Sequence, residues 1–424
     1  MIDQVQITRL DNGLTILTEH MPGLRSATLG IWVRRGSRRE SPPLNGICHF
    51  IEHALFKGTT RRSAHQIAEE SDRLGGHLDA YTAHEMTGFA LKVVDSEIPR
   101  AFDLLADLLS NPRFEPDDLV KEQRVIIEEM KMIEDTPDEL LTEIFHAAYF
   151  PNHSLGRPIE GTELTVSSFD QSKTVDFHAE NFAPQNLIVA AAGNLNHQEL
   201  TDLVEKLFGD KKNPAPLEAE KPCPPTVAAP IVIERKTELE QAHLIVAAPW
   251  PSAKSADRYA ASMLGTIIGG GTSSRLWQSI REDRGLAYSI GAGGNTYSDV
   301  GMFTIYAGTS PGQLNEVLDL SLAELRRAVR EVVSKAELQL AREQAISSVL
   351  LSLESSSARA GTLARQEIIH GCRISPEEIT KSLEAVTPED VQRVAEQCFT
   401  TSALALGALG NLNGFAVDRT RLEM

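Results

Sequence analysis

The chain has 424 residues, of which 42% are hydrophobic, and its 59 acidic against 41 basic residues give a formal net charge of −18. This length predicts two domains, because single hydrophobic cores rarely grow beyond about 250–300 residues. The acidic balance argues against nucleic acid, which is bound through basic patches, and would suit cationic peptides. No apolar run approaches the roughly 20 residues of a membrane span, and the N-terminus has no targeting pattern. We therefore expect no membrane span.

The four cysteines are too scattered to suggest a disulfide framework or a metal-binding Cys-x-x-Cys pair: Cys48, Cys223, Cys372 and Cys398. Free thiols are typical of a reducing compartment, so we expect a cytoplasmic location, in a bacterial cell.

In the first half of the chain, the sequence pattern predicts strands followed by helices. Residues 7–19 alternate around Asp11-Asn12-Gly13, a turn signal, which predicts a hairpin. Ser63 is an expected helix N-cap, and Gly75-Gly76 an expected helix end. In chain order we then expect a strand at 27–34, helices at 46–57 and 63–74, paired strands at 77–82 and 86–93, and helices at 97–109 and 116–134.

The second half repeats this order. The quartet Gly193-Asn194-Leu195-Asn196 recurs as Gly410-Asn411-Leu412-Asn413, each time after an apolar strand. We expect strands within 231–248, helices at 256–268 and 273–282, strands at 287–293 and 301–307, and a helix at 311–332. The sequence therefore predicts an α+β protein with two homologous domains, each an antiparallel sheet with helices packed on it. The predicted domains are 1–212 and 231–424, joined by a Pro-, Ala- and Glu-rich linker at 213–230.

The helix at 46–57 carries a candidate metal site. His49, Glu52 and His53 share one third of its circumference, whereas the apolar side chains share the other side. Imidazoles at i and i+4 can reach one zinc ion at about 2.0–2.1 Å. The order His-x-x-Glu-His is the inverted form of the usual zinc-protease helix motif. Two histidines four apart are also common without any metal, so the motif alone leaves both readings open.

Residues 46–59 resemble the active-site helix of the M16 family of zinc metallopeptidases, which includes pitrilysin, insulinase and the mitochondrial processing peptidase. That family takes a third ligand from a Glu about 75 residues after the second His, with another important Glu seven residues earlier. Glu129 and Glu122 stand at these positions. The alternative Glu128 lies with Arg124 and Lys131 on the expected solvated side of the helix, whereas Glu129 lies in an expected apolar stripe. A carboxylate in an apolar stripe is costly unless a metal or a partner compensates it, so Glu129 is the predicted ligand.

The resemblance covers almost the whole chain and implies a LuxS/MPP-like metallohydrolase fold with one Zn²⁺ per chain, held by His49, His53 and Glu129. It implies that Glu52 deprotonates a zinc-bound water and that buried Glu122 supports catalysis. Arg281 and Tyr288 have the spacing of a family pair that reaches the zinc site and contacts the substrate or the transition state.

The implied activity is that of a zinc endopeptidase acting on unfolded peptides or short polypeptide segments. In the family a strand beside the zinc presents an edge to which the peptide adds as a further strand. Here that strand includes Asp79 and Ala80, and Asp79 replaces the usual Asn, which could favour basic side chains. The resemblance also implies dimerisation, and the presence of both the zinc residues and the Arg/Tyr pair in one chain favours a homodimer. The alternatives are a non-catalytic or heterodimeric subunit, and a presequence-specific processing peptidase.

Two other motif matches carry no chemistry. Residues 269–274 are Gly-rich but lack the Lys of a phosphate-binding loop. Residues 308–312 match Gly-x-Ser-x-Gly, but Pro311 follows the Ser and has no N–H for an oxyanion hole.

Overall fold

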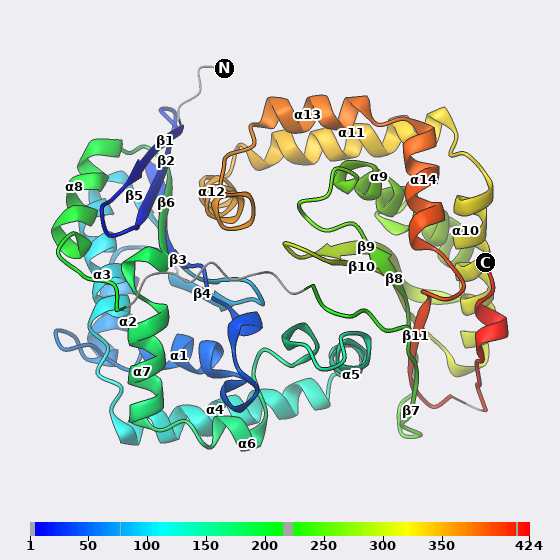
Figure 1. Cartoon of the computed structure of the whole chain (residues 1–424), viewed down its shortest axis with the longest axis horizontal. Helices are drawn as coiled ribbons and strands as arrows, with labels where there is room; N and C mark the ends of the chain where they lie inside the picture. Colours follow the sequence, from blue (N-terminus) through cyan, green and yellow to red (C-terminus); the bar gives the residue numbers. More distant parts are fainter. Residues whose placement is uncertain (1–4, 77, 215–223, 413) are drawn as a thin grey trace. The chain divides into compact units, whose positions relative to one another are not determined.

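The computed structural model describes residues 5–76, 78–214, 224–412 and 414–424 (Figure 1). The chain forms two compact units, and each unit is assembled from three separate stretches of sequence. Unit 1 comprises Met1–Lys131, Arg157–Lys221 and Leu351–Arg373, and unit 2 comprises Met132–Gly156, Pro222–Leu350 and Ile374–Met424.

The sheet of unit 1 has the strand order β1-β2-β6-β3-β5-β4 in the described ranges. Every pairing is antiparallel except that of β2 with β6, which is parallel. Strand β4 lies at one edge of the sheet. The strands are β1 (Val5–Arg9), β2 (Thr15–His20), β3 (Ser26–Val33), β4 (Leu78–Thr82), β5 (Thr87–Val94) and β6 (Leu187–Gly193).

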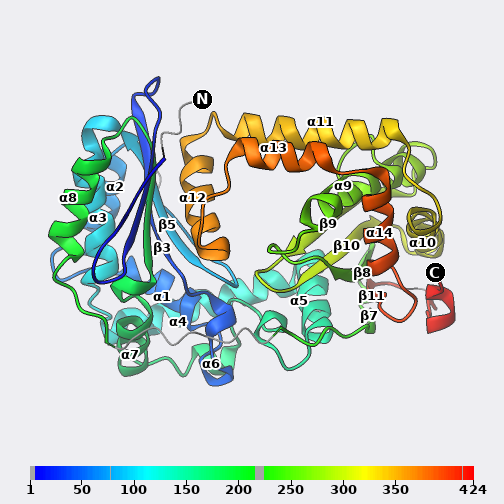
Figure 2. The same cartoon turned by 45° about the horizontal axis from the view of Figure 1, so that its top comes forward.

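Helices cover both faces of this sheet. Helix α12 packs on β6, β3 and β2, whereas α3 packs on β3 and β5 and α8 on β2 (Figure 2). Helix α4 is described with unit 1, although its last three residues belong to unit 2. The helices are α1 (Ile47–Leu55), α2 (Ala64–Arg73), α3 (Ile98–Ser110), α4 (Pro116–Glu134), α6 (Glu163–Val166), α7 (Gln171–Asn181), α8 (His197–Phe208) and α12 (Ser356–His370).

Alternation along β6 explains this layering. Leu187, Val189 and Ala191 join the core beneath α1 and α3. The intervening residues, which include Ile188 and Ala190, pack with α12. Because successive side chains of a strand point to opposite faces, a strand that is apolar throughout must be covered on both sides.

Unit 2 has the strand order β7-β11-β8-β10-β9 in its described part, with β7 and β11 parallel and the other pairs antiparallel. Helix α5 packs on β11, β8 and β7, and α9, α10 and α14 also pack on strands of this sheet. The strands are β7 (Ile231–Arg235), β8 (Ala242–Trp250), β9 (Ala287–Thr296), β10 (Gly301–Thr309) and β11 (Ala405–Gly410). The helices are α5 (Pro137–Tyr149), α9 (Arg258–Gly269), α10 (Leu314–Arg330), α11 (Lys335–Ser352), α13 (Pro376–Ala385) and α14 (Pro388–Cys398).

The two units repeat one topology. The order β2-β6-β3-β5-β4 corresponds to β7-β11-β8-β10-β9, including the single parallel pair. The repeated glycines end equivalent strands with nearly equal φ angles, 136° at Gly193 and 134° at Gly410. A Cβ at Gly193 would lie 2.4 Å from the carbonyl oxygen of Ser26, and one at Gly410 would lie 2.5 Å from that of Gln241. Only glycine meets both requirements.

The predicted α+β class and the two-domain arrangement are confirmed, with the refinement that each sheet contains one parallel pair. The element predictions agree closely with the structure, and the helix expected at 116–134 is observed as α4 (Pro116–Glu134). The expected helix at 273–282 is instead largely the π-helical segment η6 (Trp277–Glu282). His77, Asn413 and residues 215–223 of the expected linker lie outside the described residues.

Each of the two stretches that cross between the sequence halves contains one helix that packs on the sheet of the other unit's sequence half. Helix α12 comes from the second half of the chain but belongs to unit 1, and α5 comes from the first half but belongs to unit 2. Each therefore covers a sheet built mainly from the other half.

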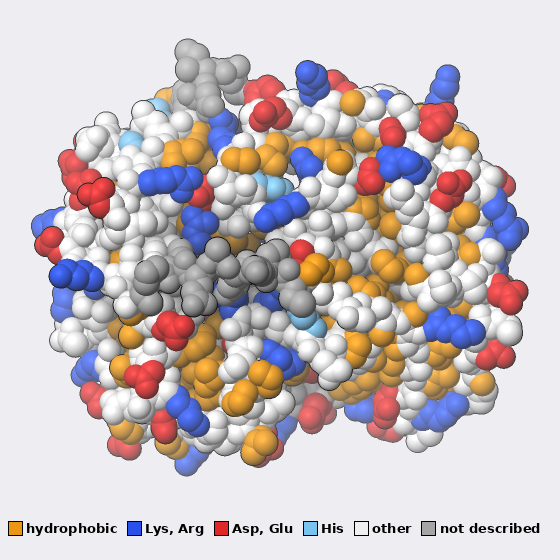
Figure 3. Space-filling view, viewed as in Figure 1, with side chains coloured by type: hydrophobic (Ala, Val, Ile, Leu, Met, Phe, Trp, Pro, Cys, Tyr) orange, Lys and Arg blue, Asp and Glu red, His pale blue; other side chains and the backbone are white. Residues whose placement is uncertain are grey.

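Surface charge is interspersed on the face shown in Figure 3, where Lys and Arg alternate with Asp and Glu. In the described ranges, every helix is too short or too polar to cross a lipid bilayer.

Candidate metal centre

Helix α1 (Ile47–Leu55) is anchored by its apolar side. Ile47, Phe50 and Ile51 are fully buried, which leaves the histidine side of the helix for other contacts. The buried Glu40 side chain accepts hydrogen bonds from the backbone N–H of Gly46 and of Cys48, both at 2.8 Å. A carboxylate satisfying these otherwise unpaired donors stabilises the helix start. The anchored helix fixes the direction in which its polar side chains project.

The structure brings His49, His53 and Glu129 together, and one ligand atom from each lies within 4.8 Å of the other two. The Oε2 atom of Glu129, on α4, lies 3.9 Å from Nε2 of His49 and 3.6 Å from Nε2 of His53. Both separations exceed the usual hydrogen-bond length of about 2.7–3.2 Å. In a tetrahedral zinc site with bonds of about 2.0–2.2 Å, neighbouring ligand atoms lie about 3.4 Å apart. The three groups are thus spaced as ligands around an ion.

The donor set also fits zinc chemically. Two imidazoles and one carboxylate form a three-ligand set that leaves a fourth position open, as catalytic zinc sites do. Burial, reinforced by the neighbouring His53, lowers the pKa of His49 to about 4, so its ring is neutral near pH 7. Its Nδ1 atom is buried and has no hydrogen-bond partner in the described part of the chain. A neutral imidazole is the form that binds a metal.

Glu52 lies on the same side of α1 and is 9% exposed. The Thr82 hydroxyl, at the end of β4, donates a 2.6 Å hydrogen bond to its Oε2 atom. Burial raises the pKa of Glu52, although the Thr82 hydrogen bond and the charge of His53 oppose the rise. A carboxylate whose pKa is shifted toward neutrality is suited to accept and return a proton.

Glu122, also on α4, connects to the second imidazole. Its Oε2 atom lies 3.3 Å from Nδ1 of His53, and its Oε1 atom lies 2.8 Å from Nζ of Lys57. Burial alone would raise the pKa of Glu122, but these two partners outweigh it and lower the pKa. For His53, burial is outweighed by Glu122 and the nearby Glu129 and Glu52, and the pKa is raised. Glu122 therefore stays ionised beside the ring.

Neighbouring Glu128 points elsewhere. Its side chain is 69% exposed and pairs with Lys131 at 2.7 Å on the solvated side of α4. Glu129 is 37% exposed and faces the imidazoles. The expected apolar stripe around Glu129 is only partly present, because Ile126 is fully buried whereas Val125 is 43% exposed.

The four other predicted site residues occupy two places. Asp79 is exposed and Ala80 half-buried on the edge strand β4, which packs against α1. Arg281 and Tyr288 lie together in unit 2, where the Arg281 guanidinium carbon is 5.0 Å from the centre of the Tyr288 ring. The same guanidinium lies 4.1 Å from the ring centre of Trp277, so two aromatic faces hold it. Tyr288 is 80% exposed.

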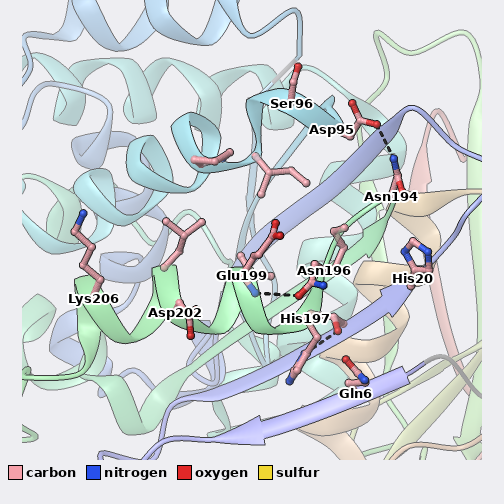
Figure 4. A pocket seen from close by; sticks show the side chains of 16 residues that line it. Gln6, His20, Asp95, Ser96, Asn194, Asn196, His197, Glu199, Asp202 and Lys206 are labelled. Atoms are coloured by element: carbon pink, nitrogen blue, oxygen red, sulfur yellow. Dashed lines mark hydrogen bonds between the residues drawn. The ribbon is translucent and has the colours of Figure 1, made fainter.

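A separate cavity of about 1090 Å³ opens in unit 1 between β1, β2, the start of α3 and α8 (Figure 4). His197 lines it, with both ring nitrogens 2.8 Å from threonine hydroxyls, Thr8 at Nε2 and Thr18 at Nδ1. Asn194 donates to Asp95 across another part of the wall. None of the three candidate metal ligands lines this cavity.

Three residues that contact the site were not singled out from the sequence. Thr82 touches Glu52, Lys57 touches Glu122, and Glu40 holds the start of α1. The sequence held a signal for Lys57, which is four residues after His53 and thus near it at the helix end. Thr82 contacts α1 from a strand 30 residues away, and Glu40 does so from the preceding loop, whose path residue spacing does not reveal.

Comparisons with known families agree with this architecture. Residues 15–163 match the model described as Insulinase (Peptidase family M16), and residues 168–345 match the model described as Peptidase M16 inactive domain. Among solved structures, "The crystal structure of a protease from Helicobacter pylori" superposes with a TM-score of 0.88 at 22% identity, covering 97% of this chain and 100% of that one. The structural likeness shows the shared fold.

Relatives at higher identity span nearly the full chain. The Bacillus subtilis (strain 168) protein named "Uncharacterized zinc protease YmxG" is 38% identical over 397 residues, covering 93% of this chain and 96% of the relative. A Rickettsia bellii (strain RML369-C) protein named "Uncharacterized zinc protease" is 35% identical over 425 residues, covering 98% and 100%. At this identity and coverage, the chain belongs to the insulinase (M16) family of peptidases.

Proposed function

We propose that this chain is a zinc-dependent endopeptidase that cleaves unfolded peptides or short polypeptide segments. The observation that carries the proposal is the convergence of His49, His53 and Glu129 within 4.8 Å, beside the buried carboxylate of Glu52. Several relatives are named zinc proteases, which supports the same chemistry here.

Each residue has a role that follows from its surroundings. Zinc held by His49, His53 and Glu129 would supply a Lewis acid and lower the pKa of a water molecule. Glu52 accepts the proton of the attacking water and returns it to the leaving amine. Glu122 is expected to support the site through His53.

The substrate is expected to bind along β4. This strand is an edge of its sheet, so its outer backbone groups can pair with an extended peptide. It packs against α1, and Thr82 at its end is hydrogen-bonded to Glu52, so an added strand would run past the catalytic carboxylate. The exposed carboxylate of Asp79 on the same strand would favour basic substrate side chains.

Arg281 and Tyr288 are proposed to bind the substrate or stabilise the developing oxyanion. A guanidinium that contacts two aromatic rings is a preorganised donor for such charge. Because one chain carries both these residues and the zinc ligands, we infer that it works as a homodimer, which sedimentation analysis would test.

The activity test compares the wild type with Glu52→Gln on an internally quenched fluorescent peptide, with zinc measured in both proteins. The proposal expects zinc in both and cleavage by the wild type alone, since Gln cannot accept the proton. Equal cleavage by both proteins would contradict the role of Glu52. Absence of zinc and cleavage from the folded wild type would instead indicate a non-catalytic partner subunit. A peptide library then tests specificity, because a presequence-processing enzyme would demand arginine near the cut.

A further inference from the structure

Lys57 forms an ion pair at the end of the candidate metal helix. It follows the last residue of α1 by two positions, and its Nζ atom lies 2.8 Å from Oε1 of Glu122. The Glu122 side chain is only 6% exposed, whereas that of Lys57 is 37% exposed. The other oxygen of Glu122 lies 3.3 Å from Nδ1 of His53. One buried carboxylate thus bridges an ammonium group and an imidazole.

This bridge determines which nitrogen of His53 is available. When Nδ1–H donates to Glu122, the unprotonated Nε2 atom faces Glu129, from which it is separated by 3.6 Å. A hydrogen bond at one imidazole nitrogen fixes both the tautomer and the ring orientation at the other. His49 has no comparable support, because its buried Nδ1 atom has no partner among the described residues. The orientation of the imidazole pair therefore depends on the His53 side.

Lys57 in turn determines where Glu122 can point. If His53 were its only partner, the buried Glu122 carboxylate would keep one oxygen without a hydrogen bond, which is costly. The side chain could then rotate to find another partner for that oxygen. The ammonium group occupies that oxygen and leaves the second one on His53. The effect of Lys57 on the metal group passes entirely through Glu122 in this arrangement.

We propose that Lys57 is a positioning residue of the metal site, holding Glu122 so that Glu122 orients His53 for metal binding. This inference rests on the proposed function, since it assumes that His53 is a zinc ligand. It assigns a role to a residue outside the His-x-x-Glu-His motif and the third ligand. The role requires a cation at position 57 but no direct contact with the metal.

The test measures zinc affinity and zinc release rate directly, by competition with a chromophoric chelator, in four proteins. Lys57→Met is expected to bind zinc about 10–100-fold more weakly and to release it faster, because a displaced Glu122 no longer holds His53 and losing the outer partner of a ligating His has an effect of this size. Lys57→Arg keeps the cation and, because the position is partly exposed, has room for it. Its affinity should stay within about threefold of the wild type. Lys121→Met is the matched control, since Lys121 lies on α4 with its ammonium 2.8 Å from Asp118 and 67% of its side chain exposed.

A double variant distinguishes positioning from a general structural effect. If Lys57 acts through Glu122, the Lys57→Met/Glu122→Gln double variant should bind zinc no more weakly than Glu122→Gln alone. Additive losses would overturn the inference, as would a Lys57→Met protein that binds zinc like the wild type. Thermal melts of the zinc-free proteins show whether each variant folds. A folded wild type that binds no zinc would instead refute the proposed function, so the two failures are distinguishable.

Discussion

At the scale of single residues, the site depends on a few side chains whose directions are set by two helices. The i, i+4 spacing of His49 and His53 placed both imidazoles on one side of α1, as the sequence predicted. Choosing between Glu128 and Glu129 required the helical period, and the two carboxylates do point to different sides of α4. Sequence spacing was sufficient to place these side chains because the two residues of each pair lie on the same helix.

Replacing Glu129 and Glu128 separately tests that choice. Glu129→Gln should weaken zinc binding by more than about 100-fold, because losing a ligand exceeds the effect of losing an outer partner. Glu128→Gln removes only an exposed ion pair with Lys131, which contributes little, so zinc binding should not change. Zinc titration of both variants provides the comparison. Equal loss in the two proteins would contradict the assignment of the third ligand.

Removing the Thr82 hydroxyl should change the pH dependence of catalysis. The hydrogen bond to Oε2 of Glu52 stabilises the carboxylate and lowers its pKa against the effect of burial. In Thr82→Val the pKa of Glu52 should therefore rise, and the acidic limb of the kcat/KM profile should move to higher pH, with activity lost near that limb. Thr82→Ser retains the donor and should keep the wild-type profile. An unshifted profile in Thr82→Val, with zinc still bound, would rule out this role.

At this scale, sequence spacing did not reveal the contacts that side chains on other segments make with α1. Thr82 reaches Glu52 from a strand 30 residues away in sequence, and Glu40 reaches the start of α1 from the preceding loop. Hydroxyl and carboxylate groups are common in loops and strand ends, so nothing in their residue types marked these two.

At the scale of elements, helix α12 (Ser356–His370) is tied to its sheet by charge as well as by packing. The Glu367 side chain is 5% exposed and pairs with Arg9 at 2.7 Å and Arg34 at 3.0 Å. Burial would raise the pKa of Glu367, but the two arginines outweigh it and lower the pKa. An ionised, paired Glu367 therefore stabilises the folded state.

Glu367→Gln should lower the free energy of unfolding at pH 7 by about 1.5–3 kcal/mol, the contribution of hydrogen bonds to a charged group. Because the folded pKa lies below the unfolded value of about 4.3, the contribution is complete above that pH and is lost as the pH falls through the folded pKa. The difference between variant and wild type should accordingly shrink below about pH 4. Denaturant titrations at several pH values measure this. The exposed Glu205, replaced by Gln, is the control, and a pH-independent difference for Glu367→Gln would contradict the explanation.

The sequence predicted most elements because their patterns are local. Alternation marked the first hairpin, Ser63 and Gln66 form the capping box that starts α2, and the quartets that begin with Gly193 and Gly410 marked equivalent strands. The π-helical turn at Trp277–Glu282 was missed, because π-helical segments are rare and the sequence pattern predicted only that a helix forms there. The parallel pairs β2–β6 and β7–β11 join strands remote in sequence, and no local pattern encodes them.

At the scale of the whole molecule, the two sequence halves do not coincide with the two compact units, because each unit contains residues of both halves. Helices α12 and α5 each cover a sheet built mainly from the other half. In unit 1, Leu363 and Ala364 of α12 pack with Trp32 and Ile188 of the sheet. Such an exchange is invisible in a sequence repeat, because periodicity shows that a helix is amphipathic but not which sheet it covers.

The two halves, produced separately as residues 1–212 and 213–424, should therefore each expose an apolar sheet face and bind a hydrophobic dye. Mixing them should lower dye binding, because α12 and α5 can then cover their sheets. Leu363→Asp in the second half should prevent the decrease, since Leu363 is 5% exposed in the intact chain. Leu350→Asp, at a position that is 50% exposed, should permit it. Isolated halves that bind no dye would argue that each folds without the exchanged helix.

Anomalous X-ray scattering at the zinc absorption edge shows whether His49, His53 and Glu129 together hold one zinc ion. We expect one strong peak per chain, between the Nε2 atoms of the two imidazoles and the Glu129 carboxylate, and no such peak in a His49→Ala/His53→Ala variant. A zinc peak at other residues, or a zinc-loaded double variant, would contradict it.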